Sequence, residues 1–188
     1  MDEVKNIRVF LALDPPENIF HTIGDLQNRM MKFLGGEIRW VNPKGIHLTL
    51  KFFGNISADD VPAIIDSLRP VTSVTKPFAL EIRSAGVFPN AARPRVLWLG
   101  MGGETVRLVS MQAQIETVLA GAGFPKEDRP FRPHLTLARI KSPKGLAGIS
   151  NLLETGSDYK AGAFTGAGLT LFKSDLTPKG ALYSQLSY

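Results

Sequence analysis

The 188-residue chain contains no cysteine and only three histidines. Without cysteine there can be no disulfide bond, no thiolate nucleophile and no zinc site built on sulfur ligands. The sequence also has no apolar run that approaches the roughly 18 residues expected of a membrane-spanning helix. We therefore expect no membrane span, and chemistry that depends on side chains other than thiols.

The N-terminal residues 1–6 are polar and charged, unlike the apolar segment of a secretory signal. Together with the absence of cysteine, this favours a cytoplasmic protein. The formal net charge is +5, from 22 Lys and Arg against 17 Asp and Glu. A basic chain suits an anionic partner such as nucleic acid, although ordinary globular proteins can be equally basic. Nothing in the sequence indicates a cofactor or an obligate protein partner.

Two of the three histidines stand in the same four-residue word, His-Leu-Thr-Leu, at residues 47–50 and again at residues 134–137. The alternation of polar and apolar residues predicts a strand for each word. His and Thr then share one face of the strand, about 6–7 Å apart at roughly 3.3 Å per residue. The leucines point the other way, into a core.

The remaining pattern predicts one domain over residues 1–188, because no change of composition marks a linker. We expect a helix capped by Asp14 and ending at Gly35, a second from Ser57 to before Pro70, and a third over residues 104–119. Segment 142–160 is expected to be loop with a short helix. The expected strands cover residues 8–13, 38–41, 46–53, 78–87, 95–99, 133–140, 163–173 and 181–187. This mixture predicts an α/β or α+β fold, and the repeated word indicates an internal duplication with two lobes.

A histidine on each wall of a cleft can perform acid–base chemistry on one phosphodiester. A neutral imidazole takes a proton from water, and a protonated one gives a proton to the leaving oxygen. The hydroxyls of Thr49 and Thr136 can donate hydrogen bonds to the phosphate oxygens. This chemistry requires neither a metal nor a covalent intermediate.

Two alternatives apply to His47 and His134. A single histidine on a strand is commonly structural, but core packing gives no reason to repeat His and Thr together. Zinc binding requires three or four ligands, whereas each word supplies one imidazole and no third histidine lies nearby in the sequence. The acid–base interpretation is therefore preferred, with no metal.

Three further residues are candidates for substrate binding. Arg132 and Lys51 share strand parity with the His and Thr of their words and could bind phosphate. Phe10 could stack on a base, as aromatic side chains do with unpaired nucleotides. A solvated charge is the alternative for Arg132, and a place in the core is the alternative for Phe10.

The two words resemble the paired H-x-T-x motifs of the 2H phosphoesterase superfamily. Neighbouring stretches narrow the resemblance to one branch: RVFLALD from residue 8, RWVNPKGIHLTLKFFGNI from residue 39, FP at residues 88–89 followed by PRVLWLG, and RPFRPHLTLAR from residue 129. Together they resemble the bacterial and archaeal RNA 2′,3′-cyclic phosphodiesterases, once called 2′-5′ RNA ligases. The similarity runs from about residue 7 to the C-terminus.

The resemblance implies a bilobal α+β fold, with two antiparallel sheets around a central cleft and helices outside. It implies hydrolysis of an RNA 2′,3′-cyclic phosphate, or a related small cyclic nucleotide, to a 2′-phosphomonoester. His47 would be the proton donor to the 3′-oxygen, His134 the proton acceptor, and Thr49 and Thr136 phosphate ligands. Ligation through a 2′-5′ bond is the first alternative. A non-catalytic RNA- or nucleotide-binding module is the second, and the two intact His-Thr pairs argue against it.

Overall fold

A computed structural model describes residues 5–142, 144, 146–156, 159–178 and 180–186. Its strands are β1 (Asn6–Leu13), β2 (Ile38–Trp40), β3 (Leu48–Ser57), β4 (Phe78–Phe88), β5 (Val96–Gly103), β6 (His134–Ile140), β7 (Lys160–Gly166), β8 (Thr170–Thr177) and β9 (Gly180–Gln185). Its helices are α1 (Glu17–Met31), α2 (Val61–Thr72), α3 (Thr105–Gly121) and α4 (Ile149–Glu154), with short 3-10 helices η1 (Pro43–Gly45) and η2 (Ala58–Asp60).

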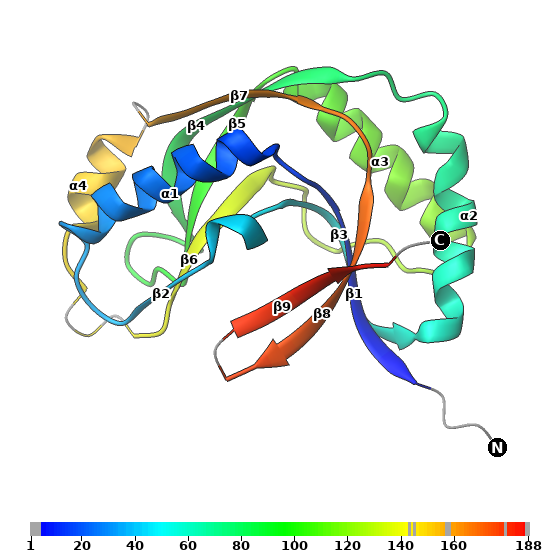
Figure 1. Ribbon diagram of the computed structural model, residues 1–188, viewed down its shortest axis with the longest axis horizontal. Helices are drawn as coiled ribbons and strands as arrows, with labels where there is room; N and C mark the ends of the chain where they lie inside the picture. The colour runs from blue at the N-terminus through cyan, green and yellow to red at the C-terminus, as the bar shows by residue number, and fades with distance from the viewer. Residues whose placement is uncertain (1–4, 143, 145, 157–158, 179, 187–188) are drawn as a thin grey trace.

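The described strands form a curled antiparallel sheet in the order β7-β4-β5-β6-β3-β1-β8-β9, with β2 also paired to β6. Helices α1 and α4 lie at one end of the molecule, and α2 and α3 lie side by side at the other (Figure 1). No helix within the described ranges is long and apolar enough to cross a membrane.

The sheet consists of two groups of strands that meet at one point. Strands β3, β1, β8 and β9 form one group, and β6, β5, β4 and β7 form the other. Among the described residues, β3 and β6 are joined by one β-ladder pair, Leu48 with Leu135. The α+β fold with two antiparallel halves and outer helices is confirmed, and the two expected sheets are continuous through this pair.

The alternation of the two His-Leu-Thr-Leu words is also confirmed. Their four leucines belong to the main hydrophobic core and are at most 2% exposed. The neighbouring His and Thr side chains are only partly buried and lie on the other face. A strand with one buried face fixes its register strongly, because a slip by one residue would move the leucines out of the core.

The start of α1 and the end of α2 differ from the sequence prediction. Helix α1 starts at Glu17 after Pro16, rather than being capped by Asp14. A residue that precedes proline is pushed out of the helical region, so Asp14 and Pro15 must both be extended. Helix α2 continues past Pro70 to Thr72, since buried side chains on both sides of this proline pack on the core.

The expected strand 163–173 is two strands. Strand β7 ends at Gly166 and β8 begins at Thr170, with Gly168 between them at a φ of +76°. Glycine adopts this left-handed conformation without a steric penalty, which allows the chain to turn there. The prediction of one long strand was therefore wrong.

Each motif strand is held by a buried glutamine from a helix. Gln27 on α1 donates from Nε2 to the carbonyl oxygens of Val41 and Leu137. Gln112 on α3 donates from Nε2 to the carbonyl of Leu50, the extra residue of a β-bulge opposite β1. The glutamines thus bond the last residue of each word, which extends the internal repeat beyond the words themselves.

We expect Gln27→Leu to lower the free energy of unfolding by about 1–3 kcal/mol, because the carbonyls of Val41 and Leu137 lose the hydrogen bonds from Gln27. Among the described residues only the Leu137 carbonyl keeps another hydrogen bond, from the Val41 N–H. Urea denaturation measures the change. The matched control is Gln114→Leu on the exposed side of α3, which should stay within about 0.5 kcal/mol of the parent. Equal stability of the two variants would show that Gln27 does not hold β6.

Candidate active site

The two His-Leu-Thr-Leu words meet where the halves of the sheet join. Because Leu48 pairs with Leu135 in antiparallel register, residue 47 lies opposite 136 and residue 49 opposite 134. Each His is therefore beside the Thr of the other word, on the face away from the leucines. His47 and His134 are diagonal neighbours, a relation that puts side chains about 7–8 Å apart. The structure thus brings together all four residues predicted to be catalytic.

Both imidazole rings are fixed in the same way. His47 Nδ1 lies 2.9 Å from the carbonyl oxygen of Gly45, and His134 Nδ1 lies 2.6 Å from that of Arg132. A carbonyl oxygen only accepts, so Nδ1 carries the proton in each ring. Each neutral imidazole then has its lone pair on Nε2, the atom that is left to act as acid or base.

Aromatic rings hold the orientation of both imidazoles. The Phe10 ring stacks on His47 with centroids 4.4 Å apart, and Tyr183 meets the same imidazole edge-on at 5.0 Å. Phe88 meets His134 edge-on at 5.0 Å. These contacts restrict ring rotation and also remove water from the imidazoles.

Burial lowers the pKa of both histidines. Desolvation lowers the pKa of His47 to about 4, against the opposing effect of its bond to Gly45, and the charge of His134 lowers it further. Desolvation also lowers the pKa of His134, opposed by its bond to the Arg132 carbonyl and assisted by the charge of Arg139. Both imidazoles are therefore neutral at pH 7 when the site is empty, and a bound anion would favour protonation.

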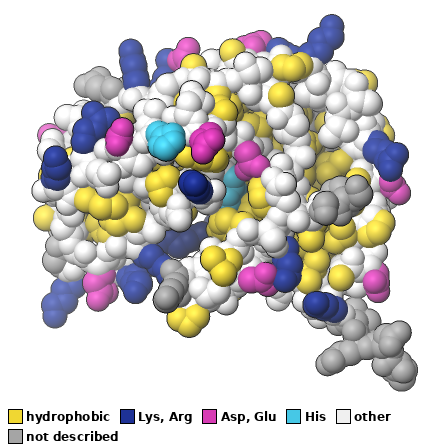
Figure 2. Space-filling view, viewed as in Figure 1, with side chains coloured by type: hydrophobic (Ala, Val, Ile, Leu, Met, Phe, Trp, Pro, Cys, Tyr) yellow, Lys and Arg dark blue, Asp and Glu magenta, His cyan; other side chains and the backbone are white. Residues whose placement is uncertain are grey.

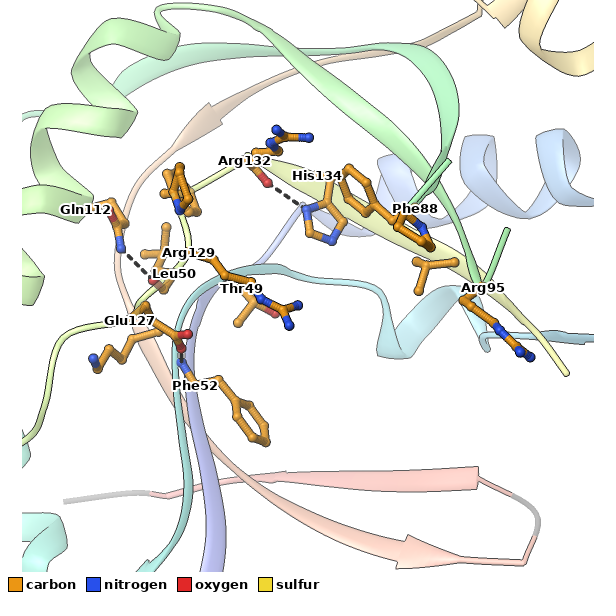
Figure 3. A pocket seen from close by; sticks show the side chains of 15 residues that line it. Thr49, Leu50, Phe52, Phe88, Arg95, Gln112, Glu127, Arg129, Arg132 and His134 are labelled. Carbon is orange, nitrogen blue, oxygen red and sulfur yellow. Dashed lines mark hydrogen bonds between the residues drawn. The ribbon is translucent and has the colours of Figure 1, made fainter. Parts of the chain in front are cut away.

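A cavity of about 830 Å³ opens beside His134 and Thr49 (Figure 3). Its wall also contains Phe52, Phe88, Glu127 and the three arginines Arg95, Arg129 and Arg132. His47 and Thr136 are not part of this wall. On the face shown in Figure 2, basic side chains lie along the edge and inside a hollow. The cavity is thus positively charged, as binding of an anion requires.

Arg132 is placed as expected, at the cavity and next to the second word. Arg95 and Arg129 line the same cavity but are not among the substrate ligands predicted from the sequence. Arg129 is in the connection that precedes the second word, and Arg95 directly precedes β5. Both occur in stretches that carry the family resemblance, and Arg129 is also a basic residue that flanks the second word.

The prediction that Phe10 stacks on a base was wrong. Its side chain is only 3% exposed and packs against Phe172 as well as His47. Phe172 is on β8, which pairs with β1, and Tyr183 on β9 meets the Phe10 ring edge-on at 5.1 Å, so aromatic side chains cover the ring. Phe10 positions the imidazole of His47 instead.

The structure also disagrees with Lys51 as a phosphate ligand. Its ammonium group is 2.8 Å from the Glu116 carboxylate and donates to the Pro125 carbonyl, and the residue is 3% exposed. The parity argument failed because the β-bulge at Leu50 turns the chain between Thr49 and Lys51. Lys51 is therefore part of a buried ion pair.

This ion pair fixes one wall of the cavity. Glu116 on α3 also accepts from Gln112 and from the backbone N–H of Glu127. The connection between α3 and β6 is thereby tied to β3 at Pro125, which accepts from Lys51, and to α3 at Glu127, which donates to Glu116. The same connection carries Arg129 and Arg132. The buried Lys51–Glu116 pair therefore helps to fix the backbone from which these two side chains extend.

No group of three or more His, Cys, Asp or Glu side chains that could hold a metal occurs among the described residues.

We expect Lys51→Met to lower the free energy of unfolding by about 3–5 kcal/mol, because it leaves the Glu116 carboxylate buried without a cation. The double variant Lys51→Met/Glu116→Gln should lose less, since no buried charge is left. Urea denaturation compares them, with exposed Lys32→Met as control. A double variant as unstable as the single one would contradict a charge effect.

Comparison with known proteins identifies the family of the chain. The family model described as LigT like Phosphoesterase matches residues 13–98 and 102–183. An RNA 2′,3′-cyclic phosphodiesterase of Methanothermobacter thermautotrophicus is 30% identical over 180 residues, 96% of each chain. One from Aeropyrum pernix is 34% identical over 152 residues, 81% of this chain and 85% of the relative.

Solved structures agree in fold. The Thermus thermophilus protein TT0787 superimposes with a TM-score of 0.76 at 30% identity, over 96% of both chains. Escherichia coli LigT complexed with 3′-AMP gives a TM-score of 0.74 at 25% identity, over 97% of both chains. Because the family model matches nearly the whole chain, the chain belongs to the LigT-like phosphoesterases.

Proposed function

We propose that this protein hydrolyses the 2′,3′-cyclic phosphate ends of RNA to 2′-phosphomonoesters. The main observation in support of the proposal is the pair of imidazoles where β3 and β6 meet, His47 directly before β3 and His134 at the start of β6. Each has Nδ1 bound to a backbone carbonyl and Nε2 left for chemistry. The relatives named RNA 2′,3′-cyclic phosphodiesterases support the substrate class. Small cyclic nucleotides are related substrates for the same chemistry. A cysteine-free chain that acts on RNA ends also suits the cytoplasm.

In this mechanism His134 is the base and His47 is the acid. Nε2 of His134 takes a proton from water as the water oxygen attacks phosphorus. The bond between phosphorus and the 3′-oxygen breaks, and the 3′-oxygen receives the proton from Nε2 of His47. The product is a 3′-hydroxyl and a 2′-phosphomonoester, and the two imidazoles have exchanged protonation states. Proton exchange with solvent restores the starting state.

Thr49, Thr136 and Arg132 are proposed to stabilise the negative charge of the phosphate. Negative charge grows on the non-bridging phosphate oxygens as water attacks, and hydrogen bonds that strengthen at that point lower the barrier. The hydroxyls of Thr49 and Thr136 lie beside the imidazoles and are the proposed donors. Arg132 is a proposed ligand for the same phosphate, because its guanidinium can form paired hydrogen bonds.

The bound phosphate also changes the protonation state of the two imidazoles. The lowered pKa values make both free imidazoles poor at holding a proton at neutral pH. An anion placed between them favours the charged form of one ring, while the like charge of that ring disfavours protonation of the other. The substrate thus selects the singly protonated pair that acid–base catalysis requires.

Incubation with an oligonucleotide that ends in a 2′,3′-cyclic phosphate tests the proposal. We expect a product with a 2′-phosphate, and a loss of about 10²–10⁴-fold in rate for either His47→Ala or His134→Ala. Chromatography separates the 2′- and 3′-phosphate products. His21→Ala, at an exposed position on α1, is the matched control and should keep the parent rate.

Several results would contradict the proposal. A joined oligonucleotide as the product would indicate ligation. Near-normal hydrolysis by a folded His47→Ala or His134→Ala variant would remove the acid–base pair. Loss of activity after dialysis against a chelator, with recovery on adding a divalent ion, would show that a metal takes part. A predominantly 3′-phosphate product would reverse the roles of the two histidines.

A further inference from the structure

Phe52 is an exposed aromatic side chain at the cavity. Its exposed fraction is 39%, although it stands in a strand whose neighbouring residues Leu50 and Lys51 are buried. It lines the same cavity as Thr49 and His134. Because Leu50 is the extra residue of a bulge, Phe52 is two ladder positions from Thr49, about 7 Å along the strand. In Figure 3 its ring points away from His134, at the other end of the lining side chains.

An arginine accompanies this ring. The guanidinium carbon of Arg8, on neighbouring β1, lies 4.4 Å from the Phe52 ring centroid. The backbone N–H of Phe52 donates to Glu127 at 3.3 Å, which ties the residue to the connection that carries Arg129. A partly exposed ring held beside a cation is a suitable surface for an unpaired base and the phosphate next to it.

The charge of the cavity exceeds what one phosphate needs. Its wall contains Arg95, Arg129 and Arg132 against the single carboxylate of Glu127, apart from the paired Lys51. Arg8 adds a fourth cation beyond Phe52. A mononucleoside 2′,3′-cyclic phosphate carries one negative charge, whereas each further nucleotide adds another. The distribution of charge therefore fits a polynucleotide end better than a single nucleotide.

We propose that Phe52 and Arg8 form a subsite for the second nucleotide from the cyclic end of RNA. The base of that nucleotide stacks on Phe52, and Arg8 pairs with a phosphate of the chain. This inference rests on the proposed function, because the cyclic phosphate must lie at His134 and Thr49 for the next nucleotide to reach Phe52. It follows that the enzyme selects RNA ends over mononucleoside cyclic phosphates.

The test compares two substrates, adenosine 2′,3′-cyclic phosphate and the dinucleotide ApA with a 2′,3′-cyclic phosphate end. For the parent protein kcat/KM should be higher for the dinucleotide. In Phe52→Leu the ratio of the two kcat/KM values should fall about 10-fold, within the range expected for loss of one base–aromatic stack. Arg8→Gln should lower the same ratio and weaken its dependence on salt.

Two variants serve as controls. Phe52→Trp keeps a stacking surface and should preserve the ratio, while exposed Arg69→Gln on α2 removes a distant cation and should leave both substrates at the parent rate. An unchanged ratio in Phe52→Leu, equal losses on both substrates, or a parent protein without preference for the dinucleotide would each overturn the subsite. Failure of the parent protein to hydrolyse either substrate would instead overturn the proposed function.

Discussion

The pairing of Leu48 with Leu135 is the constraint on which the site depends. It is the one recorded residue pair that joins β3 to β6 in the described part of the chain, and thus the two halves of the sheet. Both leucines are fully buried, so any slip of register would expose apolar side chains and bury histidines. The same pair places each His beside the other word's Thr. Core packing therefore fixes the geometry of a polar site on the opposite face.

The buried polar network reinforces this junction from behind. Gln27 and Gln112 reach from the helices to the last residue of each word. Gln112 also bonds Glu116, whose ion pair with Lys51 ties the arginine-bearing connection to β3. A buried polar network stabilises a fold only when its polar groups have hydrogen-bond partners. Here both glutamines, Lys51 and Glu116 have partners within the protein. The imidazoles and the arginines are thus held by one connected structure.

The sequence predicted the parts of the site that depend on repetition and alternation. Two identical words were sufficient to predict that His47, Thr49, His134 and Thr136 share one face and that their leucines lie in the core. It did not predict where residues after a bulge point, because the bulge at Leu50 arises from pairing with β1. Lys51 was misassigned for this reason.

Long-range packing explains the other differences. Phe10 was misassigned since its burial depends on β8, which lies far away in the sequence and covers it. Arg95 and Arg129 come to one cavity from separate connections, and no local pattern marks such a meeting. Strand parity therefore identifies a face, but tertiary pairing decides whether that face is open to a ligand.

The central claim is that two partly buried imidazoles share one proton across a phosphate. The pH dependence of kcat/KM tests it most directly, because this quantity reports the ionisation of the free enzyme. Burial lowers both pKa values below 6.5, and the active form carries one proton on the pair. The account predicts a bell-shaped profile with its optimum below pH 6.5, and an optimum for kcat at higher pH, since the bound anion raises proton affinity. An optimum of kcat/KM above pH 6.5, or the absence of an acid limb, would contradict it.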